Sequence, residues 1–464
     1  MRNYRTTIDM QDNEIKYIDL FAGLGGFHFA LEELGCRCVF SSEIKEDLRR
    51  LYSINFPDSR IEGDITKIAP TDIPAHDVLC AGFPCQPFSQ AGKRQGFNDE
   101  KDRGNLFNYI CAILQHHRPR YVFLENVSNL KGHDDGNTWK VIFHKLSDSI
   151  NEGGLNYEVR EAILSPHQFG LPQHRRRIYI VCEAREYGRL ENFNFPVPNN
   201  RKCDITKMID ASDTDYLPLK TETRNQLKIW QEFINQCIAH GQDIPTFPIW
   251  AMEFGATYEF KEVAPAYQTI ANLTKYRGKL GCEIKGTNKD TCLACLPIYA
   301  QTKKDKRFPD WKIRYIEQNR TFYLRNQEWL DTWLRSVETF ENSHLKMEWN
   351  CGKKANPILT DKIIQFRASG IRVKLPTFSP ALNLCGTQIP ILPWVKLPVE
   401  ALAKGDEPMG RYMTRKEAAL LQGMRRLIFG NDTFQLSVPR SYAALGNAVN
   451  VTIVKHIAKK LLGL

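Results

Sequence analysis

The stretch YIDLFAGLGG, residues 17–26, decides the fold class of this chain. Its first half is mostly apolar and predicts a buried β-strand, and the glycines that follow predict a tight turn. Residues 27–34 continue with a short helical pattern that Gly35 ends. A second strand is expected over residues 38–40. The order of strand, turn, helix and strand therefore predicts a βαβ unit.

The acid that follows this unit indicates a ligand. Glu43 stands about 20 residues beyond Gly23, where nucleotide-binding βαβ units place a carboxylate on ribose hydroxyls. The glycine spacing is not the dinucleotide fingerprint, so there is no pyrophosphate to cradle. An adenosine ligand without phosphates fits better, and S-adenosylmethionine is the expected one. The alternative is a glycine turn that serves packing only.

A second stretch, CAGFPCQPFSQAG at residues 80–92, follows apolar residues that predict another buried strand. Pro84 and Pro87 flank Cys85, which fixes the backbone and leaves this cysteine at the carboxyl end of the strand. Ligands of open α/β sheets bind at that edge. A thiol there is placed for nucleophilic attack, and the alternative is a small buried hydrophobic residue.

Two further strands are expected to bring charged residues to the same edge. Glu125 directly follows the apolar run 121–124. Because an unpaired buried charge is costly, this position predicts a functional carboxylate. Arg175 and Arg177 precede the predicted strand 178–181 at alternate positions that share one face. They suit gripping one substrate, and a solvated basic turn is the alternative.

Together, in their order along the chain, these blocks resemble the DNA (cytosine-5) methyltransferases. The blocks are FAGLGG at 21–26, GFPCQPFS at 82–89, ENV at 125–127, QHRRR at 173–177, RYMT at 411–414 and GNAV at 446–449. The resemblance covers about residues 15–183 and 410–464. It implies a class I S-adenosylmethionine-dependent methyltransferase fold: a Rossmann-like α/β domain with a mostly parallel sheet and helices on both faces. A smaller target-recognition domain is expected as an insertion.

The resemblance also implies which residues hold the cofactor. They are Phe21, Gly23, Leu24, Gly25, Gly26, Glu43, Asp64, Ile65, Gly82, Leu106, Asn447 and Ala448. Glu43 is expected on the ribose, Asp64 on the adenine amino group and Ile65 on the adenine face. Two positions depart from the family pattern: Ala448 stands where a serine is common, and Ile44 where an aromatic can stack on adenine. Both departures concern cofactor affinity rather than the chemistry.

For catalysis, the resemblance implies that Cys85 adds to carbon 6 of cytosine and so makes carbon 5 nucleophilic. Glu125 is expected to give a proton or a strong hydrogen bond to N3, and Arg175 and Arg177 to orient the base. The base must leave the duplex stack to react. The polar residues 89–105 are expected to close over the substrate.

The expected domains are residues 1–185 for catalysis and cofactor binding, 186–408 for target recognition, and 409–464 as a return to the catalytic domain. The middle segment is rich in proline and lacks the alternating βα pattern of its flanks. A last helix is expected from Gly446 to Leu462 and is expected to pack beside the first glycine turn.

The middle segment contains most of the expected DNA contacts. Residues 303–315 interleave cations with aromatic residues, a composition that can contact phosphates and bases, although a solvated face is the alternative. The Thr-Phe pair at 377–378 is the candidate for the family's recognition dipeptide. The full expected set is Ser89, Gln90, Arg103, Lys303, Lys304, Arg307, Arg314, Thr377 and Phe378. By contrast, the apolar residues in 329–337 have helical spacing, which predicts that they are buried in the hydrophobic core.

Composition limits the class of protein. The chain has 464 residues, 42% of them hydrophobic and 25% charged, and a net charge of +10. These values are typical of a globular protein and favour a polyanionic partner. The 13 cysteines are scattered, which favours a reducing compartment. The pair Cys292 and Cys295 lacks a second pair at zinc spacing, so no metal is expected. No apolar run is long enough for a membrane span.

We therefore expect a cytoplasmic bacterial enzyme, associated with the nucleoid through double-stranded DNA and acting as a monomer. A cognate restriction endonuclease is a candidate partner. One alternative is an RNA cytosine-5 methyltransferase, although the long insertion favours DNA. The other is a non-catalytic DNA-binding relative, which is expected to have lost Cys85, Glu125 or the glycines, all of which are present.

Overall fold

The computed structural model divides into two compact units. The residues that it describes are 14–84, 106–199, 201–382, 388–397 and 409–464. Unit 1 takes residues 1–209, 377–387 and 415–464, and unit 2 takes residues 210–376 and 388–414. The chain thus leaves unit 1, returns to it for a short segment, and returns again near its carboxyl end.

These units differ from the expected domains at their boundaries. Residues 186–209 stay with unit 1 because their backbone is bonded there. The amide of Leu190 donates to the carboxylate of Glu183 at 2.9 Å, and the amide of Asn199 donates to the carbonyl of Gln168 at 2.9 Å. Residues 409–412 form a strand of the sheet of unit 2.

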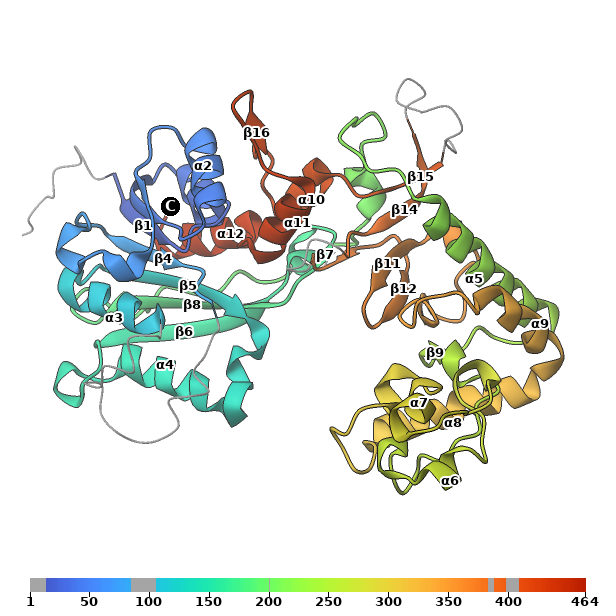
Figure 1. Ribbon diagram of the computed structural model, residues 1–464. Coiled ribbons are helices and arrows are strands. Elements are labelled where there is room, and N and C mark those ends of the chain that lie inside the picture. The colour runs from blue at the N-terminus through green and yellow to red at the C-terminus, as the bar shows by residue number, and fades with distance from the viewer. Residues whose placement is uncertain (1–13, 85–105, 200, 383–387, 398–408) are drawn as a thin grey trace, which may run out of the picture. The chain divides into compact units, whose positions relative to one another are not determined.

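Unit 1 is built on a seven-stranded sheet (Figure 1). In order across the sheet its strands are β3 (Ile61–Glu62), β2 (Arg37–Ser42), β1 (Lys16–Leu20), β4 (Val78–Ala81), β5 (Tyr121–Val127), β8 (Arg177–Ala184) and β6 (Tyr157–Leu164). The pairs from β3 to β5 are parallel, and β8 is antiparallel to both of its neighbours. The predicted Rossmann-like, mostly parallel sheet is confirmed.

Helices cover both faces of this sheet. Those of unit 1 are α1 (Gly26–Glu32), α2 (Glu46–Asn55), α3 (Leu106–His117), α4 (Asn137–Ser147), α10 (Arg415–Leu421), α11 (Val438–Asn447) and α12 (Val451–Leu461). On one face, Val122 of β5 shares a core with Ile110 of α3 and Ile142 of α4. On the other face, the ring of Phe123 contacts that of Phe27 in α1 at a centroid distance of 5.2 Å, and α12 packs against α1.

Two short strand pairs complete unit 1. Strand β7 (Gln173–His174) pairs in parallel with β13 (Ser379–Pro380), and β16 (Gly430–Asn431) pairs with β17 (Phe434–Gln435) in a hairpin. The first pair attaches the segment that returns at residue 377 to the edge that precedes β8.

Unit 2 has a sheet of its own. Its strands, in order, are β15 (Met409–Tyr412), β14 (Ile391–Lys396), β11 (Ile363–Arg367), β12 (Gly370–Lys374), β10 (Lys346–Asn350) and β9 (Ile249–Trp250). Its helices are α5 (Thr221–Ala239), α6 (Ile270–Leu273), α7 (Lys289–Ala294), α8 (Asp310–Arg325) and α9 (Gln327–Val337). All pairs but β10 with β12 are antiparallel.

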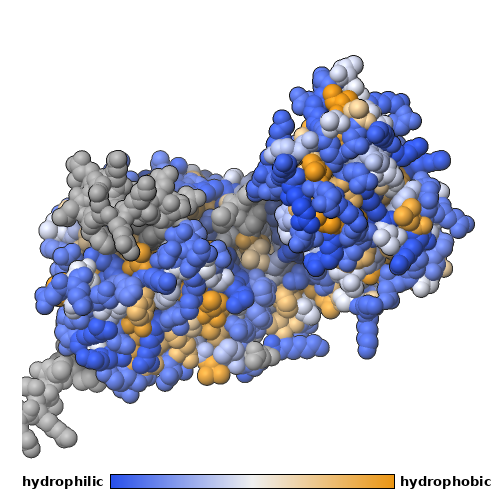
Figure 2. Space-filling model, turned by 90° about the horizontal axis from the view of Figure 1, so that it is seen from below, coloured by the Kyte–Doolittle hydropathy of each residue, from blue (hydrophilic) through white to orange (hydrophobic). Residues whose placement is uncertain are grey.

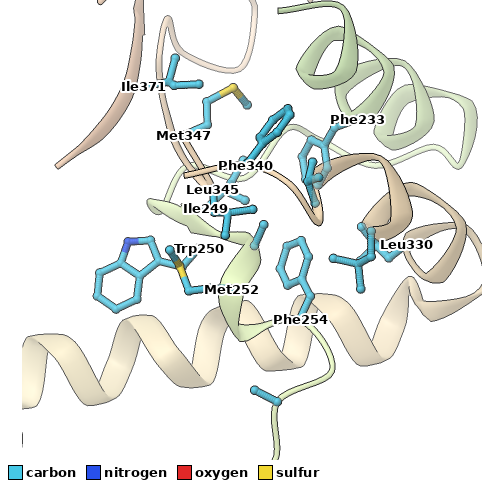
Figure 3. Packing of buried hydrophobic residues seen from close by; sticks show 14 of the residues in the cluster. Phe233, Ile249, Trp250, Met252, Phe254, Leu330, Phe340, Leu345, Met347 and Ile371 are labelled. Atoms are coloured by element: carbon cyan, nitrogen blue, oxygen red, sulfur yellow. The ribbon is translucent and has the colours of Figure 1, made fainter. Parts of the chain in front are cut away.

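An aromatic-rich core fills unit 2. Figure 3 shows Phe233, Phe254 and Leu330 converging from three separate segments. The apolar face of α9 is buried, as its helical spacing predicted; its members are Trp329, Leu330, Trp333, Leu334 and Val337. Tertiary packing rather than strand length therefore holds this unit together, since β9 contributes only two residues to the sheet.

The face in Figure 2 is mostly hydrophilic, with separate small apolar patches. Within the described ranges, no helix combines the length and apolarity needed to cross a membrane.

The cysteines of those ranges are all free thiols. In the same part of the chain, no three His, Cys, Asp or Glu side chains gather to hold a metal ion.

Candidate active site

The carboxyl ends of three neighbouring strands bring the predicted functional residues together. In the register of the sheet, Leu20 of β1 lies beside Ala81 of β4, and Ala81 lies beside Leu124 of β5. The next residue of each strand is therefore at the same edge. These residues are Phe21, Gly82 and Glu125, from the cofactor and catalytic sets.

The turn after β1 has a backbone that only small residues allow. Gly25 adopts a φ of 79° at the start of α1, and a Cβ there would lie 2.4 Å from the ring of Phe56. A Cβ at Gly26 would lie 2.6 Å from the carbonyl oxygen of Val449. The turn is therefore packed between α2 and the segment before α12, as expected for the carboxyl-terminal return.

Glu43 fixes this turn to the end of β2. Its carboxylate is buried, and it accepts hydrogen bonds from the amide of Gly23 at 3.0 Å and from the amide of Lys45 at 2.9 Å. Each carboxylate oxygen can accept further bonds, so ribose hydroxyls remain within its capacity. Beside it, the side chain of Ile44 is 64% exposed and presents an apolar surface at the same position.

The remaining cofactor residues of the first part of the chain differ in accessibility. Asp64 is half-buried, and one of its oxygens accepts bonds from the amide and hydroxyl of Thr66, at 3.0 and 2.8 Å. Ile65 is 4% exposed and belongs to the core beneath the sheet. Leu106 is half-buried at the first turn of α3. In these positions Asp64 is more open to a ligand than Ile65.

The single helix predicted from Gly446 to Leu462 is wrong. Helix α11 ends at Asn447 and α12 begins at Val451. The three residues between them are extended at Ala448 and at Asn450, whose side chain caps α12 by accepting from the amide of Ile453. This break places backbone carbonyls of residues 446–449 against the sheet edge, where a continuous helix would bond them internally.

Glu125 is the central acid of the edge. It is 6% exposed, and its carboxylate lies 3.2 Å from Nε of Arg177. Its Oε2 atom is 3.9 Å from the place that a Cβ on Gly82 would take. Its Oε1 atom, the oxygen that lies next to Arg177, is buried; this contact is an ion pair without hydrogen-bond geometry, so Oε1 accepts no hydrogen bond from the described residues. Burial raises the pKa of this carboxyl, and the cations of Arg177 and Arg175 oppose the rise.

Arg175 has partners that the sequence did not indicate. Its guanidinium is 2% exposed and donates to the carbonyl of Gly446 at 2.8 Å and to that of Ala448 at 2.9 Å. Its own amide donates to the hydroxyl of Ser165 at 2.9 Å. Both terminal nitrogens are therefore used to tie the break between α11 and α12 to the sheet edge, whereas Arg177 is the arginine in contact with Glu125.

Asn126 is a further residue of this site. Its side-chain amide donates to the carbonyl of Phe83 at 2.9 Å, and its oxygen accepts from the amide of Val127 at 2.8 Å. The first bond fixes the chain two residues before Cys85. The signal in the sequence was its place directly after Glu125, on a strand that neighbours β4.

The comparison with known proteins agrees with this architecture. A family model for C-5 cytosine-specific DNA methylases matches residues 15–463. The chain belongs to this family.

Type II methyltransferase M.DsaV of Dactylococcopsis salina is 48% identical over 201 residues, 43% of this chain and 55% of that protein. Type II methyltransferase M.HhaI of Haemophilus parahaemolyticus is 44% identical over 190 residues, 41% of this chain and 55% of that protein. This methylase-family chain thus spans about half the length of the curated relatives it matches. The solved structure of Entamoeba histolytica methyltransferase EhMeth is 15% identical, with a TM-score of 0.47, and covers 97% of this chain and 99% of that one.

Several functional predictions for this C-5 cytosine methylase fall on residues that the structure does not describe. Cys85, Ser89, Gln90 and Arg103 all lie outside the described ranges, as does the whole segment 89–105. Gly82, Phe83 and Pro84 are the last described residues before them, and Asn126 holds this approach in place.

The predicted recognition dipeptide of this methylase belongs to unit 1. The ring of Phe378 stacks on His167 and His174, with centroid distances of 5.6 and 5.8 Å. Thr377 begins the segment of unit 1 that forms β13. The two residues are therefore fixed beside the strand edge rather than within unit 2.

The basic DNA contacts predicted in this methylase lie in unit 2. Lys303, Lys304, Arg307 and Arg314 are all exposed on or before α8. Arg307 is paired with Asp310 at 2.9 Å, which reduces its availability to a phosphate.

Proposed function

We propose that this protein transfers a methyl group to carbon 5 of cytosine in double-stranded DNA. The observation that carries the proposal is the buried carboxylate of Glu125 at the edge of a methylase-family sheet. Burial raises its pKa, and its Oε1 atom, 3.2 Å from Nε of Arg177, accepts no hydrogen bond from the described residues. A carboxyl in that state can give a proton to a ring nitrogen.

The residues present fit S-adenosylmethionine as the cofactor. The turn from Phe21 to Gly26 and the buried carboxylate of Glu43 suit an adenosine ligand without phosphates, and Ile44 offers an exposed apolar side chain beside them. When bound, S-adenosylmethionine supplies the methyl group. Asp64, Gly82, Leu106 and the residues at 447–448 complete the proposed pocket, and Ile65 supports it from the core.

Cys85 is the proposed nucleophile. Its thiolate adds to carbon 6 of the ring, a carbon–sulfur bond forms, and N3 takes a proton from Glu125. Carbon 5 becomes electron-rich and reacts. At carbon 5 the cofactor would supply the methyl group, with S-adenosylhomocysteine as the leaving group. Loss of the carbon 5 proton to solvent water, cleavage of the carbon–sulfur bond and return of the N3 proton to Glu125 then restore the aromatic ring and the thiolate. Arg177, 3.2 Å from Glu125, holds that carboxyl and orients the base.

The DNA must present the cytosine outside its stack, since the acid lies in a buried corner of the sheet edge. We propose that unit 2 recognises the sequence and that the basic residues before α8 contact phosphates. A monomer in the bacterial cytoplasm, associated with the nucleoid through DNA, fits this function. A cognate restriction endonuclease is the proposed partner.

The test is a covalent trap. A duplex with 5-fluorocytosine at the target position cannot lose a proton from carbon 5, so the adduct with Cys85 should survive denaturation in the presence of cofactor. The target is first located by bisulfite sequencing of methylated plasmid DNA. Cys85→Ser should abolish the adduct, while Cys80→Ala, which changes a buried thiol in β4, should keep it. An adduct on another cysteine, or with RNA alone, would overturn the proposal.

A further inference from the structure

Two lysines of unit 2 share one aromatic ring. The Nζ atom of Lys312 is 5.6 Å from the ring centroid of Tyr299, and that of Lys346 is 5.2 Å from the same centroid. Lys312 also lies 4.5 Å from the ring of Phe308, and Lys346 lies 5.0 Å from the ring of Trp250. We name these five residues the lysine pair site. Both ammonium groups are half-buried.

The elements around the site are held firmly. Lys346 is the first residue of β10 and lies opposite Trp250 of β9. Figure 3 shows Trp250 at the margin of the labelled core, beside Ile249 and Met252. The hydroxyl of Tyr299 is bonded to the fully buried carboxylate of Glu253. This hydrogen bond at Tyr299 and the burial of Trp250 and Phe308 hold the three rings in place.

No carboxylate neutralises the pair. Among the described residues, neither Lys312 nor Lys346 has an ion pair. The nearest acid to Lys346, Glu253, is taken by Arg320 at 2.9 Å and by the hydroxyls of Tyr258 and Tyr299.

Asp305 acts on Lys312 through space, but Lys304 opposes it with a positive charge. Burial lowers the pKa of both lysines, and the charge of Lys312 lowers that of Lys346 further. Two cations that repel each other in a partly dry site are destabilising by themselves. An anion between them would offset both costs.

From this geometry we infer that the lysine pair site binds a backbone phosphate of duplex DNA. The inference rests on the proposed function, which supplies the polyanion. A phosphodiester carries one charge and two free oxygens, so it can accept from an ammonium group and offset the charge of the neighbouring one. Exposed Lys303 and Lys304 extend positive charge along the chain beside the site, and the ring of Trp311, 49% exposed, adds an apolar contact for a sugar or base.

The test measures DNA binding of the full chain as a function of salt. Lys312→Gln and Lys346→Gln should each weaken binding on the order of tenfold at low salt, equally for target and unrelated duplexes. The slope of log K against log salt should become shallower by about 0.9 when both lysines are replaced, because they share one phosphate, and by part of that in each single variant. Lys312→Arg should keep the slope of the wild type. Lys353→Gln is the matched control, because it removes one charge from a lysine that is already paired with Asp243 at 2.8 Å.

A second measurement uses the unaltered protein, so it does not depend on how the variants fold. Acetylation of lysines, read by mass spectrometry, should be slowed at both positions by duplex DNA, while Lys353 reacts as before. Protection by inorganic phosphate alone at equal phosphate concentration would identify a simple anion site and overturn the DNA assignment. Equal acetylation with and without DNA, or unchanged salt slopes in both Gln variants, would also overturn it. If the wild type forms no fluorocytosine adduct, the proposed function fails instead.

Discussion

Both units of this protein bury a glutamate against an arginine, and the environments of Glu125 and Glu253 differ. In unit 2, Glu253 is fully buried, and its oxygens accept from Arg320, Tyr258 and Tyr299. In unit 1, the Oε1 atom of Glu125 lies 3.2 Å from Nε of Arg177 as an ion pair, and it accepts no hydrogen bond from a described residue. A carboxylate that only stabilises a fold uses all its acceptors, whereas one that acts on a substrate keeps an acceptor open.

The same contrast applies to the two arginines beside Glu125. Arg175 uses both terminal nitrogens on backbone carbonyls, while Arg177 makes the contact with the acid. Sequence alone treats them as equals, two residues apart. The structure separates Arg175, which holds two backbone carbonyls, from Arg177, which contacts the acid proposed to act on the substrate.

The largest effect that would sharpen this contrast is expected from Glu125→Gln. Glutamine keeps the shape of the side chain but cannot give the proton to N3, so turnover should fall by about 10²–10⁴-fold. Stability should change little, because the buried acid already carries a desolvation cost. Single-turnover methylation and thermal unfolding measure the two quantities. A variant that unfolds but retains its turnover when folded would make Glu125 a structural acid like Glu253.

Glu253→Gln should show the opposite pattern. The change leaves the guanidinium of Arg320 buried without its counter-charge, which should cost about 3–5 kcal/mol of stability. Chemical unfolding followed by tryptophan fluorescence suits this measurement, since Trp230 and Trp333 lie in the same core. The exposed ion pair of Lys353 and Asp243 provides the control. Asp243→Asn should lower the free energy of unfolding by less than about 1 kcal/mol. If Glu253→Gln and Asp243→Asn lowered the free energy of unfolding equally, Glu253 would not be a stabilising buried acid.

Arg175→Gln is expected to have an intermediate effect. It removes two charge-assisted bonds to the carbonyls of Gly446 and Ala448, so stability should fall by about 1–3 kcal/mol. Cofactor affinity should fall too, because Val449 packs on Gly26. Titration calorimetry with S-adenosylhomocysteine tests this, with Arg177→Gln as the matched variant. If the Arg175→Gln variant kept its cofactor affinity and stability but lost turnover, Arg175 would instead orient the base, as the sequence predicted.

The smallest effect concerns pH. Adduct formation needs Cys85 as the thiolate and Glu125 as the acid. The thiolate fraction stops rising above the pKa of the thiol, while the protonated fraction of Glu125 falls throughout, so the rate should drop about tenfold per unit on the alkaline side. In Glu125→Gln this descent should be absent and the rate should reach a plateau. Parallel alkaline limbs in the two proteins would mean that another group supplies the proton.

Much of unit 1 could be predicted because its signals are local. Strand β8 includes the predicted range of residues 178–181, and the glycine turn, Glu43 and Glu125 all lie at the predicted sheet edge. Strand polarity and the βαβ order determine that placement once the strands are recognised.

What could not be predicted depends on contacts between distant residues. The break between α11 and α12 is stabilised by Arg175, more than 270 positions earlier. Phe378 joins unit 1 because it stacks on two histidines, and nothing in its own neighbourhood indicates that. In unit 2, contacts in the aromatic core rather than local sequence patterns determine where the short strands form. For this reason only helix α9, whose apolar residues are strongly periodic, was predicted there.

The hydrogen bonds from Arg175 to residues 446 and 448 also set an order of events during synthesis. The sheet of unit 1 leaves the ribosome well before α12, with all of unit 2 between them. Closing so long a flexible loop costs entropy, and a unit 2 that has already folded shortens the loop that remains. Until α12 arrives, the glycine turn lacks its cover from Val449. The nascent chain can therefore fold unit 2 before the proposed cofactor pocket of unit 1 is complete, which would delay the proposed activity until translation has passed both.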